Sequence, residues 1–361
     1  MAKRRKNLGK VKRYRRSFYS GPQRAKRIAG GAVLLAALFL AGWLIGPAVI
    51  DFGTSTWYRL KRGGEPAPSS QPAVTPAPQA TASPEPTPQA TPQPMQAVGE
   101  GGWAFVGITG VKDAAAAAAT AQQLAQQGIK YAVLPLKDSQ GYVYYPSGAP
   151  AAQGSIAATT FDAAAAAAAL RDAGITPVAS ICAFRDPIAP NANRTMAVRY
   201  QDTDYFWLDA ARDAGGKPWL NPYSDEAVGY IGALIAEARG MGYEQIWLTG
   251  VQFPGVAGRD KANFGDTGGL SMGERLAQVL STWQEGGVCW VEYPLEVAAA
   301  GAESQVLGAS PAELGVKNLA LRADTAPSEE DSDRLAETVR AAKEGGVSNV
   351  AVVQGDTFAL Q

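Results

Sequence analysis

The 361-residue sequence contains no histidine and only two cysteines. The absence of histidine excludes Ser-His-Asp and Cys-His catalysis, and it excludes metal sites that use an imidazole ligand. Two cysteines cannot form a four-thiolate zinc site or a disulfide-stabilised scaffold. We therefore expect carboxylates to carry any chemistry, and the sequence predicts neither a cofactor nor a metal site.

The sequence also lacks a net charge, since 33 basic and 33 acidic residues cancel. The charges are separated along the chain. Residues 1–27 hold 12 basic and no acidic side chains, which leaves a net charge of −12 for the remainder. No folded element accompanies the basic segment to read bases, so we expect no nucleic-acid partner. We interpret residues 1–27 as a basic cytoplasmic tail that lies against the membrane.

No charged residue occurs from residue 28 to residue 50. As a helix this apolar run is about 34 Å long, and the hydrocarbon core of a bilayer is about 30 Å thick. The apolar region of a cleaved signal peptide is shorter and is followed by a small-residue cleavage site. The sequence therefore predicts a single-pass transmembrane signal anchor in the cell membrane, with the N-terminus cytoplasmic and the C-terminal domain extracellular.

Residues 51–102 are rich in proline, alanine, threonine and glutamine, with ten prolines between residues 66 and 94. Such a composition cannot bury a core, and it favours extended polyproline-II segments. We interpret residues 51–102 as a disordered linker that holds the following domain away from the membrane.

Residues 103–361 repeat one pattern, in which an alanine-rich helix is followed by a glycine and then by a short apolar strand. Glycine suits the end of a helix because it tolerates the left-handed backbone conformation found there. With an opening strand at 103–108 the pattern gives seven strands. They are nearly continuous apolar runs, as in a parallel sheet covered on both faces. The glycines before the other six strands are Gly128, Gly174, Gly242, Gly287, Gly315 and Gly346.

Seven strand-helix repeats in about 250 residues predict an α/β fold, a TIM-type (β/α)8 barrel. The eighth strand is not evident: residues 305–309 are one candidate, and an incomplete barrel is the alternative. A doubly wound sheet is a further alternative, although no G-x-G-x-x-G phosphate loop supports it. Helix starts are predicted at Asp113, Ser224 and Ser271, the last opening a capping box. Cys182 and Cys289 fall within predicted strands, and we expect them to stay free thiols.

The active site of such a barrel lies where its strands end. Three carboxylates at these ends, Asp138, Asp186 and Glu292, are the candidate catalytic residues, because glycoside hydrolysis needs two carboxylates and no histidine. The alternative for each is a structural role as a helix cap or ion-pair partner. The long connection after the third strand contains Trp219 and Tyr223. Aromatic rings of this kind line sugar-binding sites. The alternative is that the two rings only plug the mouth of the barrel.

Four stretches share their order and spacing with a bacterial family: VLPLKDSQGYVYYPS, ASICAFRDPIAP, KPWLNPYSDEAVGYI and GYEQIWLTGVQFP. The family patterns that they resemble are V-K-D-D-x-G-x-V-x-Y, R-x-x-x-F-x-D-P, W-x-N-P-Y-S and G-F-D-E-I-x-F-D-Y-I-R-F-P. The chain thus resembles a family of glycoside-hydrolase-like barrels related to the alpha-amylases and long catalogued as a domain of unknown function. The resemblance implies a barrel that acts on or binds a polysaccharide or an oligosaccharide.

In this resemblance, the acidic residue at the end of the family's fourth strand falls on Thr249. A threonine hydroxyl without a neighbouring base is a poor nucleophile. One hypothesis is therefore a barrel that has lost catalysis and binds envelope or extracellular polysaccharide. The other is an active glycosidase that uses Asp138, Asp186 and Glu292. The resemblance and the strand-end positions together give these candidate sugar-binding residues: Lys137, Tyr145, Arg185, Trp219, Asn221, Tyr223, Gln252 and Phe253.

Overall fold

The computed structural model describes residues 98–323 and 328–361. The predicted cytoplasmic tail, the predicted transmembrane anchor and the linker up to residue 97 lie outside the described residues. Within the described part of the chain, no helix is long and apolar enough to cross a membrane.

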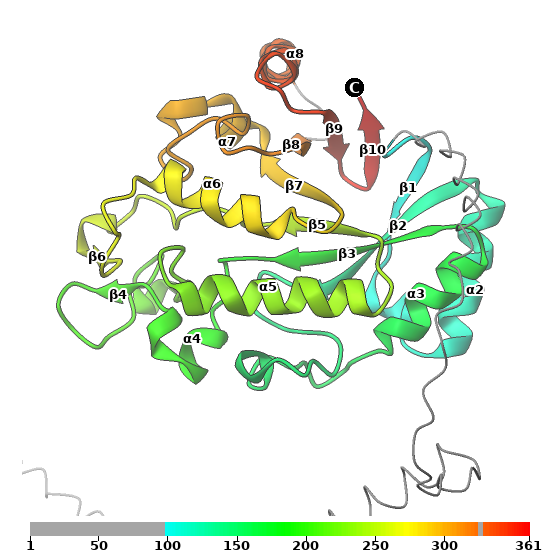
Figure 1. Ribbon diagram of the computed structural model, residues 1–361, viewed down its shortest axis with the longest axis horizontal. Helices are drawn as coiled ribbons and strands as arrows, with labels where there is room; N and C mark the ends of the chain where they lie inside the picture. The colour runs from blue at the N-terminus through cyan, green and yellow to red at the C-terminus, as the bar shows by residue number, and fades with distance from the viewer. Residues whose placement is uncertain (1–97, 324–327) are drawn as a thin grey trace, which may run out of the picture. The chain divides into compact units, whose positions relative to one another are not determined.

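An eight-stranded sheet forms the centre of the domain (Figure 1). Its first seven strands are parallel and follow chain order across the sheet, whereas a doubly wound sheet would reverse its order. The helices lie outside the curved sheet, whose two edge strands come together, so the sheet is a nearly closed barrel. The strands are β1 (Gly102–Phe105), β2 (Ile129–Lys137), β3 (Thr176–Cys182), β5 (Gln245–Thr249), β7 (Val288–Pro294), β8 (Asn318–Ala323), β9 (Asn349–Gln354) and β10 (Thr357–Leu360).

All seven predicted strands are present, but the candidate eighth strand at 305–309 is wrong, because these residues form turns and bends. Strand β10 takes the eighth position instead. It pairs antiparallel with β9, from Thr357 opposite Gln354 to Leu360 opposite Ala351. The connection between these strands contains Gly355 at a φ of +57°, a conformation that glycine adopts without steric cost.

The helices begin where the sequence predicts. The side chains of Asp113 and Ser224 each accept a hydrogen bond from a backbone N–H in the first turn, and Ser271 and Glu274 form both bonds of a capping box. The helices are α2 (Ala114–Gln126), α3 (Ala163–Asp172), α4 (Ala189–Ala192), α5 (Asp225–Gly240), α6 (Met272–Trp283), α7 (Leu295–Ala299) and α8 (Glu329–Glu344). A separate two-stranded ribbon joins β4 (Arg199–Tyr200) to β6 (Ala262–Asn263).

Aromatic rings fill the inside of the barrel. Trp103, Trp247 and Trp290 are buried in a cluster on the inner face of the sheet. The rings of Trp247 and Trp290 stack with their centroids 6.1 Å apart. Phe358 of β10 stacks on Trp103 of β1 with a centroid distance of 4.2 Å, which joins the two edge strands of the sheet. The inside of the barrel is therefore a packed core and not a channel.

Candidate functional site

Asp138 directly follows β2 and holds the turn that comes next. Its Oδ1 atom accepts hydrogen bonds from the backbone N–H groups of Gln140 and Tyr142, both at 2.9 Å, and its Oδ2 atom accepts one from the Tyr144 hydroxyl at 2.7 Å. Burial, together with the hydrogen bond to Asp138, raises the pKa of Tyr144 to about 12. The hydroxyl therefore stays protonated and donating at neutral pH, and Asp138 is engaged within its own loop.

Asp186 and Lys137 form an ion pair inside the protein. Lys137 Nζ lies 3.0 Å from Asp186 Oδ2, and both side chains are 0% exposed. The same Nζ donates to the Cys182 carbonyl oxygen at 2.7 Å. Asp186 Oδ1 accepts hydrogen bonds from the N–H groups of Ile188 and Ala189 at 2.8 and 2.9 Å. Neither charged group is accessible to a ligand arriving from solvent.

Gly141 packs against this carboxylate. Its φ is +85°, and a Cβ atom at this position would lie 2.4 Å from Asp186 Oδ1. A larger residue would therefore be strained in its backbone and would also collide with the ion pair. Lys137 and Gly141 come from the stretch VLPLKDSQGYVYYPS, and Asp186 comes from the stretch ASICAFRDPIAP. These two family stretches therefore form one structural unit.

Glu292 of β7 lies at the barrel mouth between Trp247 and Arg322. Its side chain is 12% exposed and that of Arg322 is 39% exposed. Arg322 Nε and Nη2 donate to the two carboxylate oxygens at 2.7 and 2.8 Å, and Trp247 Nε1 donates to Oε2 at 3.0 Å. The hydrogen bonding to Glu292 raises the pKa of Arg322. In such a bidentate ion pair, both oxygens of the carboxylate already accept hydrogen bonds. Each of the three candidate carboxylates thus belongs to its own network.

Thr249 ends β5 and lies opposite Cys182 of the neighbouring β3. Burial raises the pKa of the Cys182 thiol, with Lys137 acting in the opposite direction. A buried, protonated thiol is not a nucleophile at neutral pH.

Cys182 and Cys289 are both buried and free, which confirms the prediction that they form no disulfide. Among the described residues, no three acidic or thiol side chains lie together as metal ligands would.

The candidate sugar-binding residues differ in how much of each side chain reaches solvent. Arg185 is exposed, and Tyr223 and Gln252 are half-buried. Their roles in sugar binding stay predictions. The other five are buried: Lys137, Tyr145, Trp219, Asn221 and Phe253.

Tyr145 has a structural partner that the sequence does not indicate. Its hydroxyl donates to Glu237 Oε2 at 2.6 Å, as does Ser147 Oγ, and the Gly148 N–H donates to Oε1 at 2.9 Å. Burial and the bond to Glu237 raise the pKa of Tyr145. Glu237 lies on α5, so these bonds fasten the loop after β2 to a helix remote in sequence. No local pattern could have identified this carboxylate.

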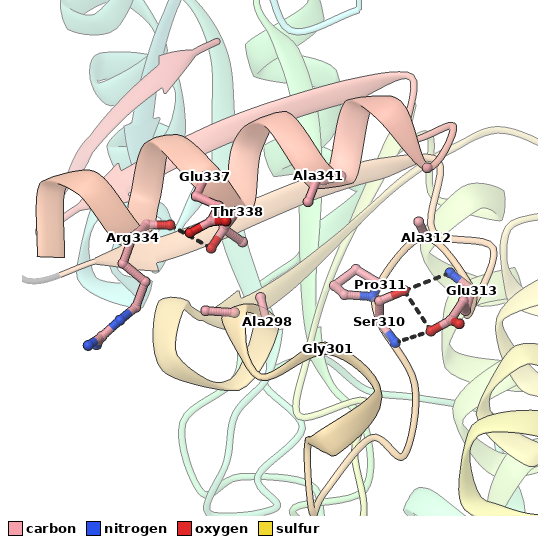
Figure 2. A pocket seen from close by; sticks show the side chains of 13 residues that line it. Ala298, Gly301, Ser310, Pro311, Ala312, Glu313, Arg334, Glu337, Thr338 and Ala341 are labelled. Atoms are coloured by element: carbon pink, nitrogen blue, oxygen red, sulfur yellow. Dashed lines mark hydrogen bonds between the residues drawn. The ribbon is translucent and has the colours of Figure 1, made fainter.

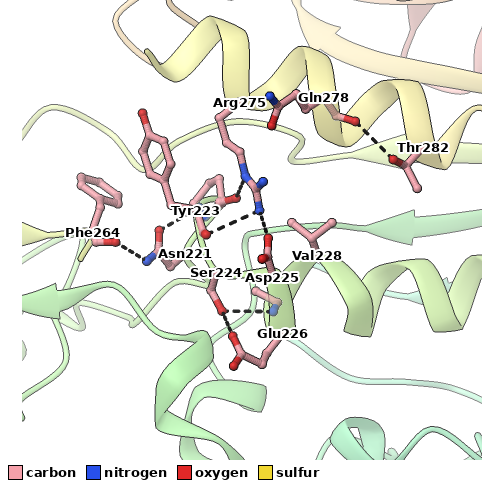
Figure 3. Close-up of polar contacts among 12 residues, drawn as sticks. Asn221, Tyr223, Ser224, Asp225, Glu226, Val228, Phe264, Arg275, Gln278 and Thr282 are labelled. Carbon is pink, nitrogen blue, oxygen red and sulfur yellow. Dashed lines mark hydrogen bonds and ion pairs between the residues drawn. The ribbon is translucent and has the colours of Figure 1, made fainter. Parts of the chain in front are cut away.

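The loop motif around Asn221 is held by contacts to backbone carbonyls (Figure 3). Asn221 Nδ2 donates to the Phe264 oxygen, and the Tyr223 hydroxyl donates to the Leu270 oxygen, both at 2.9 Å. Arg275 of α6 donates through Nε to the Pro222 oxygen at 2.8 Å. The motif therefore ties the connection after β3 to the connection after β5.

Hollows open among the connections that follow the strands. Two of them, of about 430 and 400 Å³, adjoin at Phe206, and a third, of about 370 Å³, is lined in part by Asn221 and Tyr223. Another hollow, of about 480 Å³, lies between α8 on one side and α7 with the segment after it on the other (Figure 2), and small side chains such as Ala298 and Ala341 line much of it. The first three are built from the connections after β2, β3 and β5, where barrels position their sites.

Solved structures with similar folds include a hypothetical protein from Ruminiclostridium thermocellum, 21% identical with a TM-score of 0.45 over 52% of this chain and 96% of its own. The PgaB (BpsB) glycoside hydrolase domain from Bordetella bronchiseptica is 14% identical, with a TM-score of 0.48, over 67% of this chain and 81% of its own. An exo-β-N-acetylglucosaminidase from Vibrio harveyi is 11% identical, with a TM-score of 0.46, over 71% of this chain. The chain covers 41% of that enzyme, less than half of its length.

None of the curated proteins compared with the chain matches it. Residues 105–284 match the model of a family described as "Putative glycosyl hydrolase domain". This stretch contains the four motifs, the buried ion pair and Thr249. The resemblance predicted from the sequence is confirmed: through residues 105–284, the chain belongs to this glycosyl hydrolase domain family.

Proposed function

We propose that the chain displays its barrel outside the cell membrane, where the domain binds envelope or extracellular polysaccharide without cleaving it. Membership of a glycosyl hydrolase family supports a carbohydrate ligand. The basic segment followed by 23 uncharged, mostly apolar residues supports a membrane anchor with the barrel outside. The proline-rich stretch supports a spacer between the two.

The non-cleaving part of the proposal depends on the end of β5. Thr249 stands where the family resemblance places an acidic residue. Glycoside hydrolysis needs one carboxyl group that donates a proton and a second that attacks the sugar or activates water. Asp138 and Asp186 are engaged in a turn and in a buried ion pair, respectively. They are therefore poorly placed to replace the missing group.

An active glycosidase is the second candidate, and one observation favours it. Glu292 keeps 12% of its side chain exposed at the barrel mouth, where a catalytic carboxyl group would lie. Its salt bridge to Arg322 would have to open before it could give a proton to a leaving group.

A hydrolysis assay separates the two candidates. We expect the full-length chain in detergent micelles to bind cell-wall or storage polysaccharides, measured by affinity electrophoresis, and to release no reducing ends from them. Hydrolysis that is abolished by Glu292→Gln, and not by the exposed control Asp260→Asn, would establish the glycosidase instead. Failure to bind any of the polysaccharides would contradict a binding function.

If the proposed topology is correct, the barrel is accessible to protease from outside intact cells. Protease added to such cells is expected to remove the domain from the membrane fraction, while a cytoplasmic marker protein stays intact. If the domain became sensitive to protease only after lysis, the proposed location would be wrong.

A further inference from the structure

We propose that a groove around Phe206 binds an acidic polysaccharide, one whose sugar residues carry carboxylates. This inference rests on the proposed function and names its ligand class and site. The Phe206 groove consists of the two adjoining hollows of about 430 and 400 Å³. Phe206, Leu208 and Arg212 line both of them. The walls come from the connections after β2, β3 and β5.

The charged side chains of the larger hollow are both basic. Arg212 and Lys217 are exposed, and neither side chain has an ion-pair or hydrogen-bond partner within residues 98–323 and 328–361. Some arginines of the domain are ion-paired, as Arg275 is with an aspartate and Arg322 with a glutamate, whereas Arg212 is not. Residues 103–361 hold 18 basic and 29 acidic side chains. Two unpaired cations on one wall of a predominantly acidic domain favour an anionic ligand.

The carboxylates close to these cations in sequence do not occupy them. Asp209 lines the smaller hollow, but its Oδ1 accepts a hydrogen bond from the Lys217 backbone N–H at 2.7 Å and its Oδ2 accepts one from Trp219 Nε1 at 2.9 Å. Asp213 lines neither hollow. The guanidinium of Arg212 is therefore available to bind a carboxylate through two parallel hydrogen bonds.

Aromatic rings supply the uncharged part of a sugar site. Tyr142 is 45% exposed, and Phe206 is half-buried with the Arg194 guanidinium 4.7 Å from its ring centroid, which restrains the ring. The C–H face of a sugar ring is slightly positive and packs on the electron-rich face of an aromatic ring. Gln140, also in the lining, carries an amide group that can bond to hydroxyls. Asn191 Nδ2 already donates to the Pro187 and Ile188 carbonyl oxygens, so Asn191 offers a ligand its Oδ1 as an acceptor.

The test uses the full-length chain in detergent micelles with polygalacturonate, a polymer of uronic acids, and with neutral dextran. We expect the wild type to bind polygalacturonate, and added salt to weaken this binding by screening exposed charges. Arg212→Gln combined with Lys217→Gln is expected to weaken it about tenfold, through the loss of two charge-assisted contacts. The control, Lys112→Gln combined with Lys317→Gln, removes the same charge from exposed positions outside the groove and should leave binding unchanged.

A second pair of variants tests stacking. Tyr142→Ala is expected to weaken binding several-fold, whereas Tyr205→Ala is expected to have no effect, since Tyr205 is 73% exposed but lines neither hollow. Equal binding by the groove variants and their controls would overturn the site. If the protein bound neutral polysaccharides but not polygalacturonate, the proposed ligand class would be wrong and the proposed function would stand. Failure to bind any polysaccharide would overturn both.

Discussion

Replacing Lys137 by methionine is expected to lower the free energy of unfolding by about 3–5 kcal/mol, the usual cost when a buried ion pair loses one partner. Methionine fills a similar volume but leaves the charge of Asp186 buried without its cation 3.0 Å away. It also removes the donor to the Cys182 carbonyl. Urea unfolding followed by circular dichroism measures the loss.

Lys261→Met is the matched control, because Lys261 pairs with Asp260 at 3.2 Å on the surface, where such pairs contribute about 1 kcal/mol or less. Lys137→Met combined with Asp186→Asn is expected to recover part of the loss, since the uncompensated charge is then gone. Equal costs for Lys137→Met and Lys261→Met would contradict a structural role for the buried pair.

Trp290→Ala is expected to destabilise the domain by about 3–5 kcal/mol, the range for removing a large buried aromatic side chain. Trp290 is 0% exposed, and its ring lies 5.7, 6.1 and 5.4 Å from the rings of Trp103, Trp247 and Phe358. Its Nε1 atom donates to Gln245 Oε1 at 2.9 Å, so the substitution also leaves a buried amide without its donor.

Thermal unfolding and near-ultraviolet circular dichroism measure this effect. Tyr205→Ala, which removes an exposed ring, is expected to change stability by no more than about 0.5 kcal/mol. If Trp290→Ala cost as little as Tyr205→Ala, the inside of the barrel would not be the packed aromatic core described above.

The parallel strands could be predicted because their signals are local. A glycine that ends a helix, such as Gly174 at a φ of +73°, precedes an apolar run that is buried on both faces. Strand β10 gives no such signal. It has four residues that alternate between exposed and half-buried, and it is joined to β9 by a short turn and not by a helix.

The approximate positions of the candidate catalytic carboxylates could be predicted from the sequence, but their hydrogen-bond and ion-pair partners could not. The barrel rule puts Asp138, Asp186 and Glu292 near strand ends: Asp138 directly follows β2, Asp186 lies four residues after β3, and Glu292 lies two residues before the end of β7. Asp186 and Glu292 pair with residues of other strands, Lys137 and Arg322, and those contacts form only on folding. Arg212 begins a three-residue 3-10 helix and Lys217 follows it, in a long connection whose position no periodic pattern fixes.

Closure of the barrel depends on residues from opposite ends of the domain. Strand β1 ends at Phe105 and β10 begins at Thr357, so the stack of Trp103 on Phe358 forms only after the intervening chain exists. Contacts between residues so far apart in sequence slow folding, because the entropy of loop closure is lost before the contact is gained. During synthesis, Trp103 lacks its last partner until residues 357–360 have been made. Until then β10 does not cover the edge of β1, and an exposed strand edge favours aggregation.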